Sequence, residues 1–127
     1  YKRQFLSYTN AVLESGVKII LEETKLESFI KNADFVITGE GRLDGQTVMG
    51  KAPIGVAEIA KKYEKKVLAF GGCVAEDATL CNQYGIDAFF PILRTVTTLK
   101  EAMDFNHAKE NLSAAVEQVF RLIQSFK

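Results

Sequence analysis

Short apolar runs alternate with segments of helical periodicity along this chain of 127 residues. Four of the runs have the length and composition of β-strands: Val17–Leu21, Asp34–Thr38, Val67–Phe70 and Asp87–Pro91. The two middle runs are almost continuously apolar, which is typical of strands covered on both faces. Strands that alternate with helical segments favour βα units around a parallel sheet. The pattern therefore predicts an α/β fold in which helices flank a parallel sheet.

Several helices are predicted from local signals. The spacing S/T-x-x-E at Thr24–Glu27 and at Thr98–Glu101 predicts two helix starts with capping boxes, and Pro53 suits the first turn of another helix. Residues 1–14 also have a helical pattern, and a final helix is predicted from about Asn106 to Phe126. Its apolar residues recur at i, i+3 and i+4 and predict a docking face formed by Leu112, Ala115, Val116, Val119, Phe120, Ile123 and Phe126.

The composition is that of one ordinary globular domain, with 47% hydrophobic and 25% charged residues. No Pro-rich or Ser-rich linker, internal repeat or low-complexity tract divides the sequence. Residues 1–127 are therefore interpreted as a single α/β segment.

Charge and targeting signals exclude several classes of partner. Sixteen Lys and Arg residues balance sixteen Asp and Glu residues, so no overall field attracts nucleic acid or an anionic membrane. No apolar run approaches the roughly 20 residues of a membrane-spanning helix, and no signal peptide follows the first residues. Two cysteines and one histidine do not match the spacing of a zinc site. We expect a cytoplasmic protein that binds neither nucleic acid nor membranes.

The least ordinary segment is residues 38–53, between a predicted strand and a predicted helix start. It holds four glycines together with Glu40, Arg42, Asp44, Gln46 and Lys51. In open α/β sheets, ligands bind outside the carboxyl ends of the strands, where this loop begins. Glycines allow positive φ and close approach to an oxyanion, and the following helix presents free N–H groups. The segment therefore predicts an anion-binding site.

Two well-known phosphate motifs match this segment only in part. Gly39–Asp44 starts like the dinucleotide fingerprint, but Asp44 stands where the third glycine belongs and would repel a pyrophosphate. Gly45–Lys51 matches the G-x-x-x-x-G-K part of a P-loop, yet Ala52 lacks the hydroxyl that would hold Mg²⁺, and the match does not start directly from the predicted strand. We therefore predict neither an NAD site nor a functional P-loop.

Simpler interpretations of the same residues stay open. Arg42 could pair with Asp44 as an ordinary surface ion pair, and Asp44 and Gln46 could be turn residues. Gly71 and Gly72 end the next predicted strand and could line the same edge of the sheet. The other candidates are expected to be structural: Cys73 has no histidine near it, Cys81 belongs to the core, and His107 lies at a surface or caps the last helix.

These residues carry a resemblance to a known family. DFVITGEGRLDGQT (34–47) and GKAPIGVA (50–57) closely resemble the bacterial glycerate kinases of the glycerate 2-kinase class. The resemblance continues through residues 60–63, Gly71–Gly72, residues 84–89 and the helix start at 98–102. Practically the whole chain lies within it, whereas the chain resembles only the carboxy-terminal part of such an enzyme.

The resemblance implies a larger, two-domain protein. This chain would be the segment that completes its flavodoxin-like domain, a three-layer α/β/α fold, and the rest of the kinase chain would be its partner. The implied activity is transfer of the γ-phosphoryl group of ATP, with Mg²⁺, to the 2-hydroxyl of D-glycerate, giving 2-phosphoglycerate. Because other motifs of these enzymes lie outside this sequence, we expect the segment alone to be inactive.

Phosphoryl transfer needs cations on phosphate oxygens, a carboxylate-held Mg²⁺ and a group that orients the hydroxyl. We predict Arg42 as a partner for the glycerate carboxylate or a phosphate and Lys51 as a point charge on phosphate. Asp44 or Glu40 would hold Mg²⁺ or accept the hydroxyl proton. The predicted binding residues are Gly39, Gly41, Gln46, Thr47, Gly50, Gly71 and Gly72. Cys73 departs from the small hydroxyl residue that many relatives carry there.

Two other hypotheses belong to different classes. One is a non-catalytic flavodoxin-like module that binds a phosphate-bearing metabolite through the 39–50 loop. The other is a fragment that associates with itself through strand edges left bare by a missing part.

Overall fold

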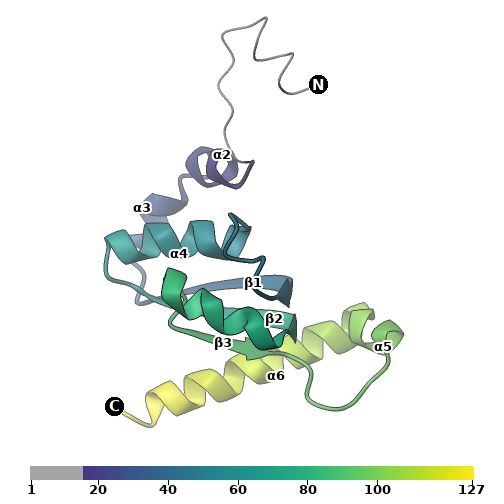
Figure 1. The fold of residues 1–127 in the computed structure, drawn as a ribbon. Helices are drawn as coiled ribbons and strands as arrows, with labels where there is room; N and C mark the ends of the chain where they lie inside the picture. The colour runs from purple at the N-terminus through teal and green to yellow at the C-terminus, as the bar shows by residue number, and fades with distance from the viewer. Residues whose placement is uncertain (1–15) are drawn as a thin grey trace, which may run out of the picture.

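The sheet of this protein has three parallel strands. A computed structural model describes residues 16–127 and contains β1 (Phe35–Leu43), β2 (Lys66–Val74) and β3 (Ala88–Pro91) in the order β1-β2-β3. Figure 1 shows the strands side by side between helices. Three of the four predicted strands and the parallel α/β class are thus confirmed. The helix predicted over residues 1–14 lies outside the described residues.

Helices cover both faces of the sheet. On one face lie α4 (Ala52–Lys62) and the 3-10 helix η1 (Glu76–Tyr84), and on the other lies α6 (Phe105–Gln124), as the two rotated views show. The ring of Phe35 meets Phe120 of α6 edge-on, with 5.6 Å between centroids. The arrangement has the three layers α/β/α of the predicted flavodoxin-like class.

The main core lies between the sheet and the layer of α4 and η1. Its fully buried members include Leu43, Ala57, Val67, Cys81 and Ile86. The short helix α5 (Leu99–Met103) begins at Thr98, whose side-chain oxygen accepts the Glu101 N–H, as the capping spacing predicts. Pro53 occupies the first turn of α4, which is also confirmed.

The predicted strand at Val17–Leu21 is wrong, because these residues lie in the helix α2 (Gly16–Glu23). Val17 and Leu21 are four residues apart and share one helical face, which packs on Gly55 of α4. A β-carbon at Gly55 would lie 2.8 Å from Val17 Cγ1, so the missing side chain makes room for this contact. A short β-branched run cannot be assigned from periodicity alone, and here the tertiary contact decides.

The capping box predicted at Thr24 is also wrong. The helix α3 (Leu26–Ile30) begins after Lys25, which has a left-handed backbone (φ 53°) and provides no side-chain cap. The Thr24 hydroxyl instead donates to the Ile20 carbonyl of α2, at 2.8 Å. The threonine therefore ends one helix rather than starting the next.

The strands extend beyond their predicted ends. β1 continues to Leu43 and β2 to Val74, so Gly39, Gly41, Gly71 and Gly72 lie within strands. A β-carbon at Gly39 would stand 2.9 Å from the Phe70 carbonyl oxygen, and one at Gly72 would stand 2.8 Å from that of Gly41. These glycines allow the two strands to approach closely, and the connecting loop is only residues 44–51.

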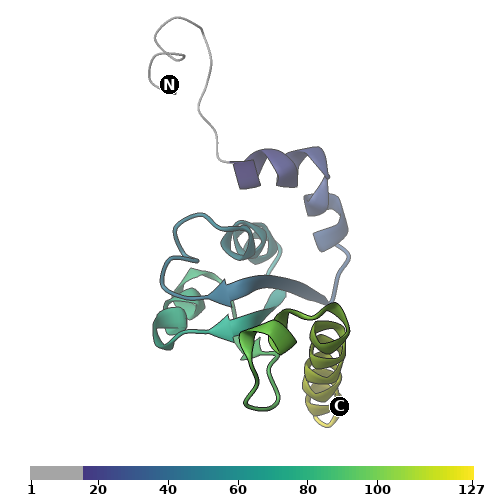
Figure 2. The same cartoon turned by 90° about the vertical axis from the view of Figure 1, so that its right-hand side faces the viewer.

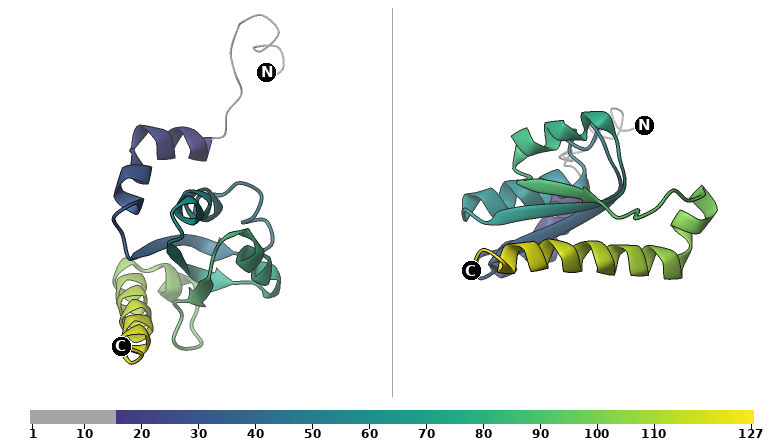
Figure 3. Two further views of the ribbon diagram at one scale, coloured as in Figure 1. Left: turned by 90° about the vertical axis from the view of Figure 1, so that its left-hand side faces the viewer. Right: turned by 90° about the horizontal axis from the view of Figure 1, so that it is seen from below.

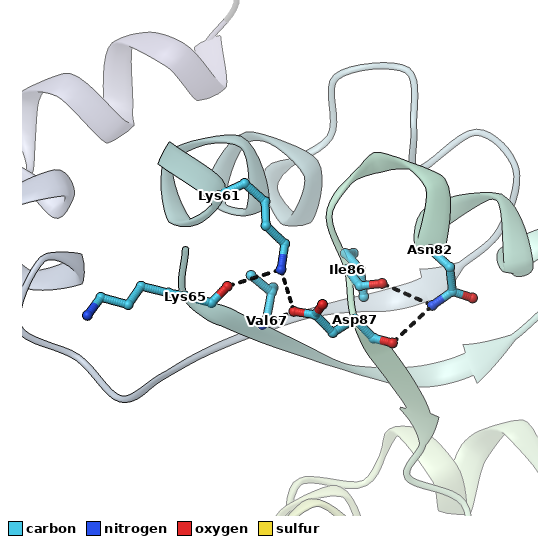
Figure 4. Close-up of polar contacts among 6 residues, drawn as sticks. All are labelled: Lys61, Lys65, Val67, Asn82, Ile86 and Asp87. Atoms are coloured by element: carbon cyan, nitrogen blue, oxygen red, sulfur yellow. Dashed lines mark hydrogen bonds and ion pairs between the residues drawn. The ribbon is translucent and has the colours of Figure 1, made fainter. Parts of the chain in front are cut away.

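A polar network joins the elements where the strands begin (Figure 4). The Asp87 carboxylate accepts the Lys61 ammonium at 2.5 Å and the Val67 N–H at 2.7 Å. Lys61 also donates to the Lys65 carbonyl at 3.0 Å. The network fastens α4 to the amino ends of β2 and β3, on the edge of the sheet opposite the loop of residues 44–51.

In the described part of the chain, no helix is long and apolar enough to span a membrane.

Candidate functional site

The loop of residues 44–51 joins the carboxyl end of β1 to α4, and its own side chains shape it. The Asp44 N–H donates to the Thr47 hydroxyl at 3.1 Å, and the Gln46 N–H donates to Asp44 Oδ1 at 2.9 Å. Thr47 is fully buried. The turn interpretation of Asp44 is therefore confirmed, and the buried Thr47 hydroxyl supports the loop from within.

Arg42 and Asp44 form an ion pair at the end of β1. The Arg42 Nε lies 3.2 Å from Asp44 Oδ2, as the surface-pair interpretation predicts. The Arg42 side chain is 63% exposed and that of Asp44 only 16%. The guanidinium is thus anchored by one N–H, and its exposed side remains able to meet an anion in bidentate fashion.

The pKa of the Asp44 carboxyl lies below its ordinary value. Partial burial alone would raise this pKa, but the Gln46 N–H and the charges of Lys51 and Arg42 outweigh that effect. The carboxylate therefore stays ionised at neutral pH, which suits a group that holds cations better than one that takes up a proton. The positive charge of Lys51 is thus one of the causes that lower the pKa of the Asp44 carboxyl.

Lys51 lies directly before α4. Its carbonyl accepts the Ile54 N–H at 3.1 Å, and its extended backbone (φ −73°, ψ 163°) marks the helix start. Gly50 before it has φ +88°, the one left-handed glycine within residues 38–53. The sequence predicted that the glycines of this segment allow positive φ. Among residues 38–53, only Gly50 uses this freedom. The helix start brings the Lys51 charge and the positive end of α4 to one place.

The segment that partly matches a P-loop lies between β1 and α4. Because β1 extends to Leu43 and α4 begins at Ala52, the segment does run from a strand directly into a helix. The prediction that the match does not start from the strand is therefore wrong. Ala52 still lacks the hydroxyl of the motif that would hold Mg²⁺, so the segment does not form a functional P-loop.

The strand register places the second glycine pair beside this loop. Glu40 pairs with Gly71, and Arg42 pairs with Cys73. Because both strands are parallel, their carboxyl ends lie at one edge of the sheet, seen in Figure 2. The predicted site residues of the two strands thus lie next to one another, and Cys73 is an exposed thiol beside Arg42.

A groove opens between this edge of the sheet and α6. It is lined by Ile37, Thr38, Gly39, Glu40, Phe70, Gly72, Ile92 and Leu112. Glu40 is half-buried there and forms no ion pair with any residue of the described range. Its carboxylate is therefore free of the internal contacts that occupy Asp44.

The loop also contacts the start of η1, although the sequence carries no signal for this contact. A β-carbon at Gly45 would stand 2.5 Å from Asp77 Oδ2, so the start of η1 packs directly on the loop. The thiol of Cys81, buried as predicted, lies 3.9 Å from the Asp44 carbonyl. No sequence signal joins these positions, because the contact arises from the crossing of η1 over the sheet.

Outside the loop, His107 lies near the start of α6, as the sequence predicts. His107 is exposed, and its N–H and Nδ1 both contact the Asp104 carboxylate that caps α6. Within residues 16–127, no group of three or more His, Cys, Asp or Glu side chains is arranged to hold a metal ion.

Comparison with known proteins places the chain in a family. The sequence profile of the Glycerate kinase family matches residues 4–124. The chain is 42% identical over 122 residues to a glycerate kinase of Bacillus subtilis (96% of this chain, 31% of the relative). It is 41% identical over 114 residues to the glycerate 2-kinase of Escherichia coli (90% and 29%). The chain therefore belongs to the glycerate kinase family, as its resemblance predicted.

The fold of the chain is also similar to part of a solved structure. Glycerate kinase 2 from Salmonella typhimurium LT2 aligns with a TM-score of 0.63 and 34% identity, over 94% of this chain and 30% of that one. The chain thus spans about 30% of the length of the relatives that it matches.

Proposed function

We propose that the full-length protein transfers the γ-phosphoryl group of ATP to the 2-hydroxyl of D-glycerate, giving 2-phosphoglycerate. The observation that carries the proposal is the loop of residues 44–51, which brings Arg42, Asp44 and Lys51 to one end of β1. Its support is the membership of the chain in the glycerate kinase family. Two cations beside an ionised carboxylate fit the positioning and charge neutralisation that phosphoryl transfer requires.

The cations are assigned to the anionic groups of the substrates. The exposed side of the Arg42 guanidinium binds the glycerate carboxylate or a phosphate, and Lys51 acts as a point charge on phosphate. Gln46 orients the substrate, and Thr47 keeps the loop in shape from its buried position. We assign the close approach of substrates to the backbones of Gly41 and Gly50, because a β-carbon at either position would meet nothing within 4 Å. At Gly39, Gly71 and Gly72, neighbouring atoms of the protein occupy that space.

We assign different roles to the two carboxylates, Asp44 and Glu40. Asp44 stays ionised and would hold Mg²⁺, which supplies charge neutralisation on the phosphates when bound. Glu40 has no cation partner within the described residues and lies in the groove, so we assign it to accept the proton of the attacking hydroxyl. ATP is the co-substrate in this proposal.

The rest of the protein is needed for activity. Because the chain spans about 30% of its relatives, we propose that it completes a flavodoxin-like domain and supplies only part of the active site. The segment alone is then inactive. We also propose a cytoplasmic location, where ATP is available.

The test is an assay of ADP release with D-glycerate, ATP and Mg²⁺, run on the longest open reading frame that contains this sequence and on the 127-residue chain. Identification of the product by NMR distinguishes 2-phosphoglycerate from 3-phosphoglycerate. We expect turnover by the long form alone, with the 2-phosphate as product. Saturable binding of a phosphorylated metabolite without turnover would instead favour the non-catalytic module.

A further inference from the structure

The segment that follows β2 contacts the start of the candidate loop at several points. The Leu43 carbonyl accepts the Ala75 N–H at 2.8 Å, directly before η1 begins. The Asp44 carbonyl lies 3.9 Å from the thiol of Cys81, which is fully buried. Figure 2 and Figure 3 show η1 and α4 on the same face of the sheet, so η1 stands beside the loop that leads into α4. The position of this loop is therefore set partly from outside the loop.

A third contact joins Gly45 of the loop to the Asp77 side chain of η1. A β-carbon at Gly45 would stand 2.5 Å from Asp77 Oδ2 and 3.1 Å from Asp77 Cγ. The first of these distances is too short for two non-bonded atoms in a packed protein. The Asp77 carboxylate therefore occupies the space that a side chain at position 45 would need.

The backbone of Gly45 does not itself require a glycine. Among the glycines that the structure describes, only Gly50 and Gly85 have a positive φ. An alanine is thus compatible with the φ of Gly45. The neighbouring carboxylate, rather than a turn conformation, accounts for the missing side chain at this position.

The Asp77 carboxylate acts on the loop through its shape. It lies in the first turn of η1, is exposed, and forms no ion pair or hydrogen bond with the residues of the described range. Its contact with Gly45 is therefore one of packing, in contrast to the polar contacts of Asp44.

A displacement of Gly45 would reach the charged groups of the site. Gln46 follows it in the chain and donates its N–H to Asp44 Oδ1 at 2.9 Å. The other oxygen of the same carboxylate lies 3.2 Å from Arg42 Nε. A shift of the loop at Gly45 would thus change the direction of the guanidinium. Such shifts matter, because a misplacement of about 1 Å can reduce the rate of a reaction roughly a hundredfold.

We propose that Asp77 is a positioning residue for the candidate site, whose carboxylate limits the movement of Gly45 and so keeps the Arg42 guanidinium in place. This inference rests on the proposed function, because the site that Asp77 supports is the one assigned to phosphoryl transfer. Asp77 itself does not contact the substrates. The contact between Asp77 and Gly45 can, however, be measured without turnover.

Two variants of Asp77 separate its shape from its charge. Asp77→Asn keeps the shape and removes the charge, whereas Asp77→Ala removes both. In the ADP-release assay of the full-length protein, we expect Asp77→Ala to lower kcat roughly tenfold at unchanged KM, and Asp77→Asn to stay within about twofold of the parent. The melting temperatures of both should lie within about 2 °C of the parent, since the side chain is exposed.

The matched control is Glu76→Ala, which removes an exposed carboxylate one residue earlier in the same turn. We expect its kcat to equal that of the parent. Parental turnover of Asp77→Ala would overturn the proposal. An Asp77→Asn protein that is as slow as Asp77→Ala would assign the role to the charge and overturn it as well.

Gly45→Ala provides a geometric test. In the parent, the new β-carbon meets the Asp77 carboxylate. Once that carboxylate is removed, the nearest atom outside residues 44–46 is the Leu80 Cδ1, at 3.5 Å, which is an ordinary contact. We therefore expect Gly45→Ala to lower kcat in the parent but to raise it roughly threefold or more in Asp77→Ala, where the methyl group refills part of the space. The same effect in both backgrounds would show that the two residues do not interact and would overturn the proposal.

Hydrogen exchange measures the loop in the absence of turnover. The Gln46 and Thr47 amides both donate to Asp44, at 2.9 and 3.1 Å. In the full-length protein without substrates, we expect both amides to exchange roughly tenfold faster in Asp77→Ala than in the parent, and at parental rates in Asp77→Asn and Glu76→Ala. Unchanged exchange in Asp77→Ala would overturn the proposal. Faster exchange in a protein whose parent does not phosphorylate D-glycerate would support the positioning of the loop by Asp77 and reject the proposed function.

Discussion

The Nε of Arg42 lies 3.2 Å from Asp44 Oδ2, while the other oxygen of the same carboxylate accepts the Gln46 N–H at 2.9 Å. A residue at the end of β1 is thereby tied to the first turn of the loop. The carboxylate fixes both the loop and the direction of the guanidinium. The simple turn interpretation and the functional interpretation of these residues are therefore compatible, because the turn holds the cation in place.

Loss of the Arg42 side chain is expected to reduce activity without unfolding the protein. Arg42 is 63% exposed, so Arg42→Ala removes little packing. If the guanidinium stabilises the negative charge of the transition state, kcat falls by roughly 10²–10³-fold in the ADP-release assay of the full-length protein. The control is Arg121→Ala, which removes an exposed arginine paired with Glu117 on α6. Near-normal turnover of Arg42→Ala would leave the residue as a surface ion pair.

Replacement of Lys51 tests whether its side chain contacts a phosphate or is only solvated. Lys51→Met keeps most of the apolar stem and removes the charge at the start of α4. We expect a higher KM for ATP, a kcat lower by roughly tenfold or more, and an unchanged melting temperature. Lys62→Met, in the last turn of the same helix, is the matched control. Kinetic constants that are equal in the two variants would rule out the proposed role.

Two glycines of β1 are expected to respond differently to alanine. A β-carbon at Gly39 would stand 2.9 Å from the Phe70 carbonyl oxygen, whereas one at Gly41 meets nothing within 4 Å. Gly39→Ala is therefore expected to destabilise the full-length protein by about 1–3 kcal/mol, measured as a fall in melting temperature.

Gly41→Ala in turn tests ligand binding, because its fold should be intact. If substrates approach the backbone at Gly41, the variant melts like the parent protein but has a higher KM for glycerate or ATP. Unchanged kinetics with unchanged stability would remove Gly41 from the predicted binding residues.

The sequence predicted the parallel sheet well, since apolar runs such as Val67–Phe70 alternate with segments of helical periodicity. It failed at Val17–Leu21, where a contact with Gly55 of α4 selects a helix for residues that also suit a strand. It also placed the ends of β1 and β2 too early, because it interpreted glycines as loop residues. In the structure those glycines permit close pairing of two strands, a property that depends on the partner strand.

The sequence predicted which residues form the candidate site, but not how distant segments pack around it. Charged residues crowded between a strand and a helix identified the segment, and the register of β1 and β2 then placed Gly71 beside Glu40. The packing of Asp77 on Gly45 had no signal in the sequence, since it arises from the path of η1 over the sheet. The sequence thus predicted the charged and glycine residues within one segment, whereas it did not predict contacts between distant segments.

The Asp87 network predicts a pH-dependent contribution to stability. Partial burial would raise the pKa of the Asp87 carboxyl, but the Lys61 ammonium, the Val67 N–H and the charge of Lys66 outweigh it, so the pKa lies below the ordinary value. A carboxyl with a depressed pKa in the folded state stabilises the protein at pH values above its unfolded pKa, about 3.9. That contribution is lost as the pH falls through the lower, folded pKa.

Asp87→Ala should therefore destabilise the full-length protein most near neutral pH. The side chain is 34% exposed, so solvent screening limits the ion pair, and we expect a loss of about 1–2 kcal/mol, mainly from the unpaired Val67 N–H. Melting temperatures from pH 7 down to pH 3 would show the gap to the parent protein narrowing below about pH 4. Glu117→Ala, which breaks the exposed pair with Arg121, is the control and should cost less than about 0.5 kcal/mol. A gap that stays constant over this range would show that Asp87 acts through packing alone.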